Sequence, residues 1–249
     1  MAFTTSVAVC GVLSFGVAIA SAVVNGVQHA VRSHKVIQGK RLSMLESSHV
    51  TRDTLVPFLC EDALRVLEDE PDRDRVDLLL LRQEACADEV QRLFDEYNAG
   101  RRPSLTDTAP IDVSLLLREY LSALPVSLVP LATLQWYLRE HGDATREESE
   151  LIMILRRLIS GLPLAHRHLI KRIFCFLHTA MQTSLHPDEA LPALAVSWSP
   201  VLIHVPPTLD NGTVEQLRLR AGWMTGSLIR LAPRIFTPEF VGKWPKRLR

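Results

Sequence analysis

The chain has 249 residues, 47% of them hydrophobic, and its 28 basic and 28 acidic side chains cancel to a formal net charge of zero. This length and apolar content exclude an intrinsically disordered chain and suffice for one large domain or two small ones. A neutral chain has no global positive field, so we expect no nucleic-acid partner.

The four cysteines, Cys10, Cys60, Cys86 and Cys175, lie far apart and form no Cys-x-x-Cys pair. This spacing is atypical of a zinc site or a disulfide framework. We therefore expect reduced, buried thiols in a cytoplasmic protein.

Residues 6–24 contain no charged side chain, and four basic residues follow between positions 32 and 41. The length is at the lower edge of a membrane span, and the composition is poor in leucine. Three interpretations stay open: the start of the globular domain, a membrane anchor that would make the chain a membrane-associated helical scaffold, and a cleaved signal. Residues 25–53 are polar and mixed, which is typical of a linker. We divide the chain into an N-terminal segment with linker (1–53), a helical domain (54–237) and a basic tail (238–249).

From residue 53 onward, apolar side chains recur at helical spacing between proline and glycine breakers, and strand patterns are essentially absent. The pattern predicts an all-α fold, a single orthogonal bundle of about eight or nine helices. Pro200 is expected to end one of them, with 201–207 extended. The predicted helices cover residues 53–67, 87–98, 111–124, 130–142, 145–160, 164–183, 187–198 and 213–231.

The segment 164–183 carries two neighbouring apolar stripes, Leu169/Ile173/Phe176/Ala180 and Ile170/Phe174/Leu177/Met181. A helix that is apolar over so wide an arc belongs in the centre of a bundle. We therefore expect this helix to be the middle of the core.

Four consecutive leucines (78–81) are followed at once by Arg82. The leucines drive the segment into a core, so the guanidinium leaves the interior at a fixed exit point. A planar, permanently charged fork at such a point suits a residue offered to a partner's phosphates. An ordinary surface arginine after a core segment fits the same local pattern.

No self-contained catalytic motif is present: the chain has no Gly-x-Ser-x-Gly elbow and no P-loop. His166 and His168 flank Arg167 without a cysteine or carboxylate at a metal-ligand spacing. We expect no metal and no cofactor, and these absences favour a protein that acts on another protein.

Several blocks in order resemble the Rho GTPase-activating (RhoGAP) domain family over residues 57–236. Leu80-Leu81-Arg82 is similar to the family's apolar-aromatic-Arg finger. Three further blocks follow at suitable spacing, and a Phe-Gly-Val opening at 15–17 also matches. These blocks are Leu116-Leu117-Arg118-Glu119-Tyr120-Leu121-Ser122-Ala123-Leu124-Pro125, then Leu162-Pro163 with His166 and Phe176-Leu177-His178, then Leu194-Ala195-Val196-Ser197-Trp198-Ser199-Pro200.

The resemblance implies signal transduction by activation of a Rho-family small GTPase in its GTP state, of the Rho, Rac or Cdc42 type. Arg82 would be the catalytic arginine finger, and hydrolysis would take place in the partner. Arg118 would position the finger loop or the GTPase. A cytoplasmic location follows, with membrane contact through residues 6–24 as an open addition.

The chain departs from the family pattern at residues that would face the partner. Glu84 stands where the family has small residues after the finger, Arg118 replaces a lysine, and Ser122 replaces a second basic residue. Ala193 replaces an asparagine that helps to hold the GTPase near its switch region. We take Arg118, Glu84, Ser122 and Ala193 as partner-binding positions. The departures keep open the alternative of a module that binds a GTPase, or scaffolds a complex, with weak or no catalysis.

Overall fold

The computed structural model describes residues 56–70, 76, 77, 79, 80, 86–141, 147–206 and 210–243. All of these residues belong to one compact unit. Within them, regular structure is entirely helical and no strand is present, which confirms the predicted all-α class. The helices are α2 (Phe58–Asp69), α4 (Ala87–Asn98), α5 (Pro110–Ser122), α6 (Leu131–His141), α7 (Glu148–Ser160), α8 (Leu164–Thr183), α9 (Pro187–Leu202), α10 (Asn211–Ile235) and α11 (Pro238–Val241).

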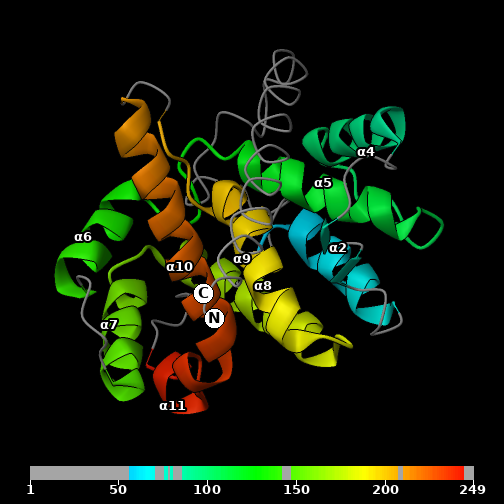
Figure 1. Cartoon of the computed structure of the whole chain (residues 1–249). Helices are drawn as coiled ribbons and strands as arrows, with labels where there is room; N and C mark the ends of the chain where they lie inside the picture. The colour runs from blue at the N-terminus through cyan, green and yellow to red at the C-terminus, as the bar shows by residue number, and fades with distance from the viewer. Residues whose placement is uncertain are drawn as a thin grey trace, which may run out of the picture. The chain divides into compact units, whose positions relative to one another are not determined.

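Helix α8 lies in the middle of the bundle and contacts α2, α9 and α10 (Figure 1). All eight side chains of its two predicted stripes are buried, as the sequence pattern predicts. Burial of both stripes is possible because α2 covers one side of the helix while α9 and α10 cover others. The central position of α8 is therefore confirmed.

Helix α5 joins the two parts of the fold that matter for the site. It packs on α2 and α4 on one side and on α9 on the other. Its apolar stripe, which runs from Val113 to Leu121, is buried in these contacts. Helix α4 ends where the sequence predicts, because Gly100 adopts φ 75°, a conformation that suits glycine.

Helix α9 does not end before Pro200, so this part of the prediction is wrong. The helix continues to Leu202, with Pro192 and Pro200 inside it. Proline removes the amide that would bond the carbonyl four residues earlier. Here the hydroxyl of Ser199 donates to the Val196 carbonyl at 3.4 Å, which replaces the missing donor. The Val129 amide also donates to the Leu202 carbonyl at 2.9 Å and holds the helix end against a neighbouring loop.

The last long helix is also longer than predicted. Helix α10 begins at Asn211, where the Asp210 carboxylate accepts a hydrogen bond from the Thr213 amide at 2.9 Å, and it reaches Ile235. The prediction for the cysteines is correct only in part. Cys60 is fully buried and Cys175 is partly buried, but Cys86 is exposed because it precedes α4 on the surface.

Candidate functional site

Arg118 is the most deeply buried charged side chain of the predicted site, with 2% of its surface exposed. Its Nη1 donates to the carbonyl of Leu79 at 2.7 Å. Its Nη2 donates to the carbonyl of Ser197 at 2.7 Å and to the Ser197 hydroxyl at 3.0 Å. The guanidinium also lies 4.9 Å from the ring centre of Trp198, a favourable cation–π distance. Arg118 thus joins α5, α9 and the segment that leads to Arg82.

Asp112 holds the chain on the other side of Arg82. Its Oδ1 accepts a hydrogen bond from the Cys86 amide at 2.6 Å, and the carboxyl group is buried. Such charge-assisted bonds are roughly twice as strong as neutral ones. The Cys86 amide lies at the N-terminal end of α4, so the same bond places the start of that helix against α5.

The two side chains that hold the chain on either side of Arg82, which we call its anchors, both belong to α5. Asp112 and Arg118 are six positions apart on α5, which corresponds to roughly 9 Å along the helix axis. They hold Cys86 and Leu79 respectively, the residues that bracket the segment with Arg82 and Glu84. Arg82 and Glu84 themselves lie outside the described residues. The described residues therefore define the two ends of this segment, which we call the Arg82 segment, and the helix that holds them.

The remaining predicted positions lie near the same centre. Ser122 is exposed and follows Arg118 by one turn of α5. Ala193 is half-buried and precedes Ser197, the partner of Arg118, by one turn of α9. Ser122 and Ala193 are thus each one helical turn from a residue of the Arg118 contact.

Sequence reasoning missed three residues of this centre. It gave no role to Asp112, Ser197 or Trp198. No sequence signal identified Asp112, because a carboxylate in the first turn of a helix is ordinarily favourable by itself and its burial is a property of the tertiary structure.

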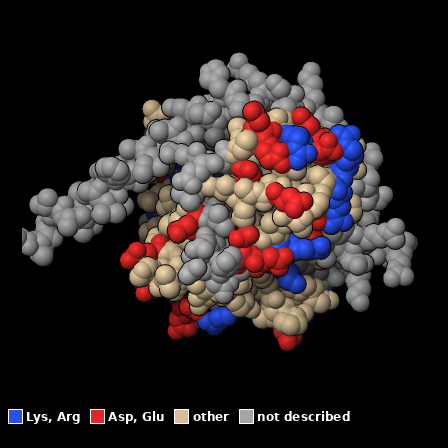
Figure 2. All heavy atoms as spheres, turned by 90° about the vertical axis from the view of Figure 1, so that its right-hand side faces the viewer, with Lys and Arg blue, Asp and Glu red and all other residues tan. Residues whose placement is uncertain are grey.

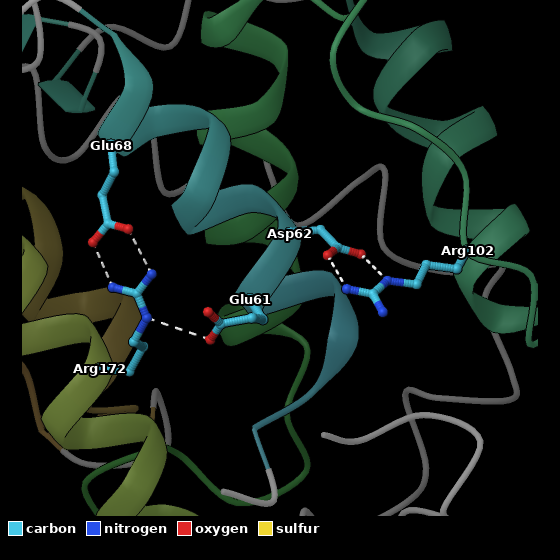
Figure 3. A network of polar contacts seen from close by, with 5 residues as sticks. All are labelled: Glu61, Asp62, Glu68, Arg102 and Arg172. Carbon is cyan, nitrogen blue, oxygen red and sulfur yellow. Dashed lines mark hydrogen bonds and ion pairs between the residues drawn. The ribbon is translucent and has the colours of Figure 1, made fainter. Parts of the chain in front are cut away.

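A second polar network fastens α2 to α8 and to the chain after α4 (Figure 3). Arg172 of α8 donates to both oxygens of Glu68 of α2, at 2.5 and 2.7 Å, and to Glu61 at 3.3 Å. Arg102, just after α4, forms a two-pronged ion pair with Asp62 of α2. Helix α2 is thus tied both to the central α8 and to the chain after α4.

Tyr97 completes this second network. Its hydroxyl donates to Asp62 at 3.0 Å. Burial, followed by the neighbouring Asp62 carboxylate, raises the pKa of Tyr97 well above its usual value of about 10. Tyr97 therefore stays a neutral donor and helps to fix α4 against α2 at any physiological pH.

Charged side chains of both signs lie next to each other on the face that Figure 2 turns toward the viewer, the right-hand side of Figure 1 with α2 and α4. Helix α4 and the turn after it carry two exposed ion pairs, Arg92 with Glu89 at 2.7 Å and Arg101 with Glu96. Exposed pairs of this kind contribute little to stability and little net potential. This face offers no field of a single sign.

Among the described residues, no group of histidine, cysteine and carboxylate side chains could hold a metal ion. His166 is buried and its Nδ1 contacts the Leu128 carbonyl at 3.1 Å. None of the described helices combines the length and apolar character needed to cross a membrane. Residues 6–24, to which we assign the open membrane contact, lie outside the described residues.

Comparison with known proteins places this geometry in context. The family model of the RhoGAP domain matches residues 63–207, more than half of the chain. The chain is 29% identical over 167 residues to GTPase-activating protein rrc-1 from Caenorhabditis elegans, covering 65% of this chain and 21% of that protein. It is 27% identical over 164 residues to Rho GTPase-activating protein 22 from Mus musculus, covering 64% and 23%. The chain thus spans about a fifth of the length of these relatives.

Two solved structures are similar in fold. Human Rho GTPase activating protein 15 aligns with a TM-score of 0.62 at 15% identity, covering 73% of this chain and 84% of that chain. The BH domain from Graf, the GTPase regulator associated with focal adhesion kinase, aligns with a TM-score of 0.57 at 16% identity, covering 72% and 92%. At these identities the likeness establishes the fold alone, and it agrees with the predicted multi-helix bundle.

Proposed function

Because the chain belongs to the RhoGAP domain family, we propose that it accelerates GTP hydrolysis by a Rho-family small GTPase, with Arg82 as the arginine finger. The observation that carries this proposal is the pair of buried anchors on α5. Arg118 holds Leu79 and Asp112 holds Cys86, so the chain enters and leaves the Arg82 segment at two defined points. A surface arginine without a positioning role needs no such support.

The chemistry of this proposal takes place in the partner. The GTPase binds the nucleotide and orients the attacking water, and the finger stabilises charge on the transferring phosphoryl group. Arginine fingers contribute about 10³–10⁵ in rate, or about 4–7 kcal/mol of activation free energy. That contribution depends on placement, since a shift of about 1 Å can cost roughly a hundredfold in rate. Arg118 and Asp112 would supply the placement, and Arg82 the charge.

Single-turnover GTP hydrolysis by purified Rho, Rac and Cdc42 types tests the proposal. We expect the wild-type chain to accelerate at least one of them, and R82A to lose the effect while it still binds the GTP form. Arg101 provides a matched control, since it is exposed and pairs with Glu96 on the surface. R101A should retain full activity. Unchanged hydrolysis by every member at saturating wild-type protein would refute the proposal.

One observation favours a second candidate function, a module that binds the GTPase without catalysis. Ala193 carries no hydrogen-bonding side chain, yet it lies half-buried one turn from the Arg118 contact. A site that lacks an amide there would bind the partner with less control over its switch region. This alternative expects binding to the GTP form without acceleration, and a gain of activity in A193N. Absence of binding to either nucleotide state would exclude it.

A further inference from the structure

An exposed serine, Ser104, lies in the loop that joins α4 to α5. Arg101 and Arg102 precede it by three and two residues, and both are exposed as well. The Ser104 hydroxyl lies 2.8 Å from the Thr106 hydroxyl and accepts a hydrogen bond of 3.4 Å from the Thr106 amide. These contacts form a small turn of the kind that serine makes with its own backbone. The Ser104 oxygen is therefore held by its own loop, at the surface.

The order of residues in this loop matches the substrate pattern of one class of protein kinase. Arginines three and two residues before a serine form the charge pattern that arginine-directed kinases select. Such kinases bind the acceptor segment in an extended form. Pro103 favours this form, because proline disfavours helical backbone at the residue before it. Ser160 also follows a pair of arginines, but it belongs to α7 and would have to leave the helix first.

Both arginines are held by carboxylates of the same chain. The Nε atom of Arg102 donates to Asp62 of α2 at 2.7 Å, and its Nη2 donates to the other oxygen of that carboxylate (Figure 3). The guanidinium lies 4.5 Å from the ring centre of Phe58. Arg101 pairs with Glu96 of α4. A kinase that recognises these guanidinium groups by its own carboxylates must first displace Asp62 and Glu96.

Leu105 adds a second restraint. It follows Ser104 directly, and only 3% of its surface is exposed. An extended segment that includes Ser104 must take Leu105 out of the apolar interior, which is unfavourable. We therefore expect the folded chain to be a poorer substrate than a free peptide of residues 98–108, by at least about tenfold in rate.

We propose that Ser104 is a phosphorylation site for an arginine-directed serine kinase, and that Asp62 and Glu96 restrain the reaction by holding Arg102 and Arg101. ATP is the phosphoryl donor. The Ser104 oxygen forms a bond to the γ-phosphorus, the bond from that phosphorus to the β–γ bridging oxygen breaks, and ADP leaves. The hydroxyl proton passes to the catalytic aspartate of the kinase. The product carries a charge of about −1.5 to −2 at pH 7 in a loop with two arginines.

Transfer of phosphate from ATP to the full chain tests the site. The probe is the purified catalytic subunit of cyclic-AMP-dependent protein kinase, which is arginine-directed, and tandem mass spectrometry locates the phosphate. Ser43 follows Lys40 and Arg41 and is a competing acceptor, so S43A is the reference chain. S43A should be phosphorylated at Ser104, and S43A/S104A should lose this phosphate. Absence of phosphate at Ser104 in S43A overturns the proposal, and so does equal incorporation in S43A/S104A.

Two variants of one ion pair separate recognition of the arginines from loosening of the loop. In the S43A background, D62N frees Arg102 and should raise the rate of phosphorylation about two- to fivefold. E96Q should act in the same direction through Arg101. R102A breaks the same pair as D62N but removes a recognised charge, so it should lower the rate. A rate that rises equally in D62N and R102A overturns the recognition of Arg102.

Glu68 supplies the matched control. It belongs to α2, as Asp62 does, but it binds Arg172 of α8. E68Q should therefore leave the rate of Ser104 phosphorylation unchanged, and circular dichroism checks that each variant is folded. Rates that stay the same in D62N and E96Q, or that rise as much in E68Q, overturn the restraint by Asp62 and Glu96. A folded chain that reacts as fast as the peptide overturns the restraint by the fold.

Discussion

Replacing Arg118 by methionine is the sharpest test of how the Arg82 segment is held. Methionine has a similar length and is apolar, so it keeps most of the packing but removes the guanidinium group. The Leu79 carbonyl and both Ser197 oxygens lose their donor, at distances of 2.7, 2.7 and 3.0 Å. The contact with the Trp198 ring is lost as well.

The magnitude follows from these contacts. Hydrogen bonds that involve a charged group contribute about 1.5–3 kcal/mol each, so the gross loss is roughly 4–9 kcal/mol. Removing a buried guanidinium also removes its desolvation penalty of several kcal/mol. We expect the free energy of unfolding to fall by about 3 kcal/mol. For a domain of this size that corresponds to a decrease in Tm of about 6–12 °C.

Two assays separate stability from positioning. Thermal unfolding by circular dichroism measures the loss of stability. Single-turnover hydrolysis, at a temperature where the variant is still folded, measures how much the chain still accelerates GTP hydrolysis by the partner. R118M should lose at least about tenfold in acceleration of the partner, since the Arg82 segment is no longer held at Leu79. R172M is the control, because the bonds of Arg172 to Glu61 and Glu68 join α8 to α2. It should lose stability and keep activity. Equal loss of activity in both variants, or no change in R118M, would refute the reasoning.

Two further predictions concern titration and reactivity. Burial lowers the pKa of His204, against opposing backbone hydrogen bonds, and burial with nearby Lys171 lowers the pKa of His168. The unfolded chain therefore binds more protons than the folded one below about pH 6.5, so Tm should fall as the pH is lowered from about 7.5 to 5. H204Q should make Tm less dependent on pH in this range. A Tm that rises on acidification would contradict the prediction. In a C10S/C175S background, Cys86 should react with a thiol reagent in the native protein, whereas Cys60, which is buried and has a raised pKa, should react only on unfolding. C86S should remove the fast phase, and a fast phase that persists in C86S would refute this assignment.

The helices were largely predictable from the sequence, because their signals are local. The two stripes of α8 identify a helix that must be buried on several sides, and Gly100 marks the end of α4 by its conformational freedom. The predicted end of α9 at Pro200 was wrong. A proline normally ends a helix, and only the hydroxyl of Ser199 at the freed carbonyl, together with the contact of Leu202 with Val129, lets α9 continue.

The candidate site was also predictable only in part. Arg82 and Arg118 could be proposed because they stand within ordered sequence blocks that resemble a known family. The hydrogen bonds by which Arg118 and Asp112 hold the chain could not be predicted. The bonds of Arg118 reach residues 39 and 79 positions away, and that of Asp112 reaches one 26 positions away. No periodicity or spacing specifies which distant carbonyl or amide a buried side chain will meet.

The sequence by itself determined the all-α class, the central helix and the family, since apolar periodicity, helix breakers and motif order are properties of the chain. Only the tertiary structure decided that α5 carries both Asp112 and Arg118, which hold the chain at Cys86 and Leu79 on either side of Arg82. The physical reason is that buried hydrogen bonds and exposed faces depend on which helices pack together. Packing brings together residues that the sequence keeps far apart.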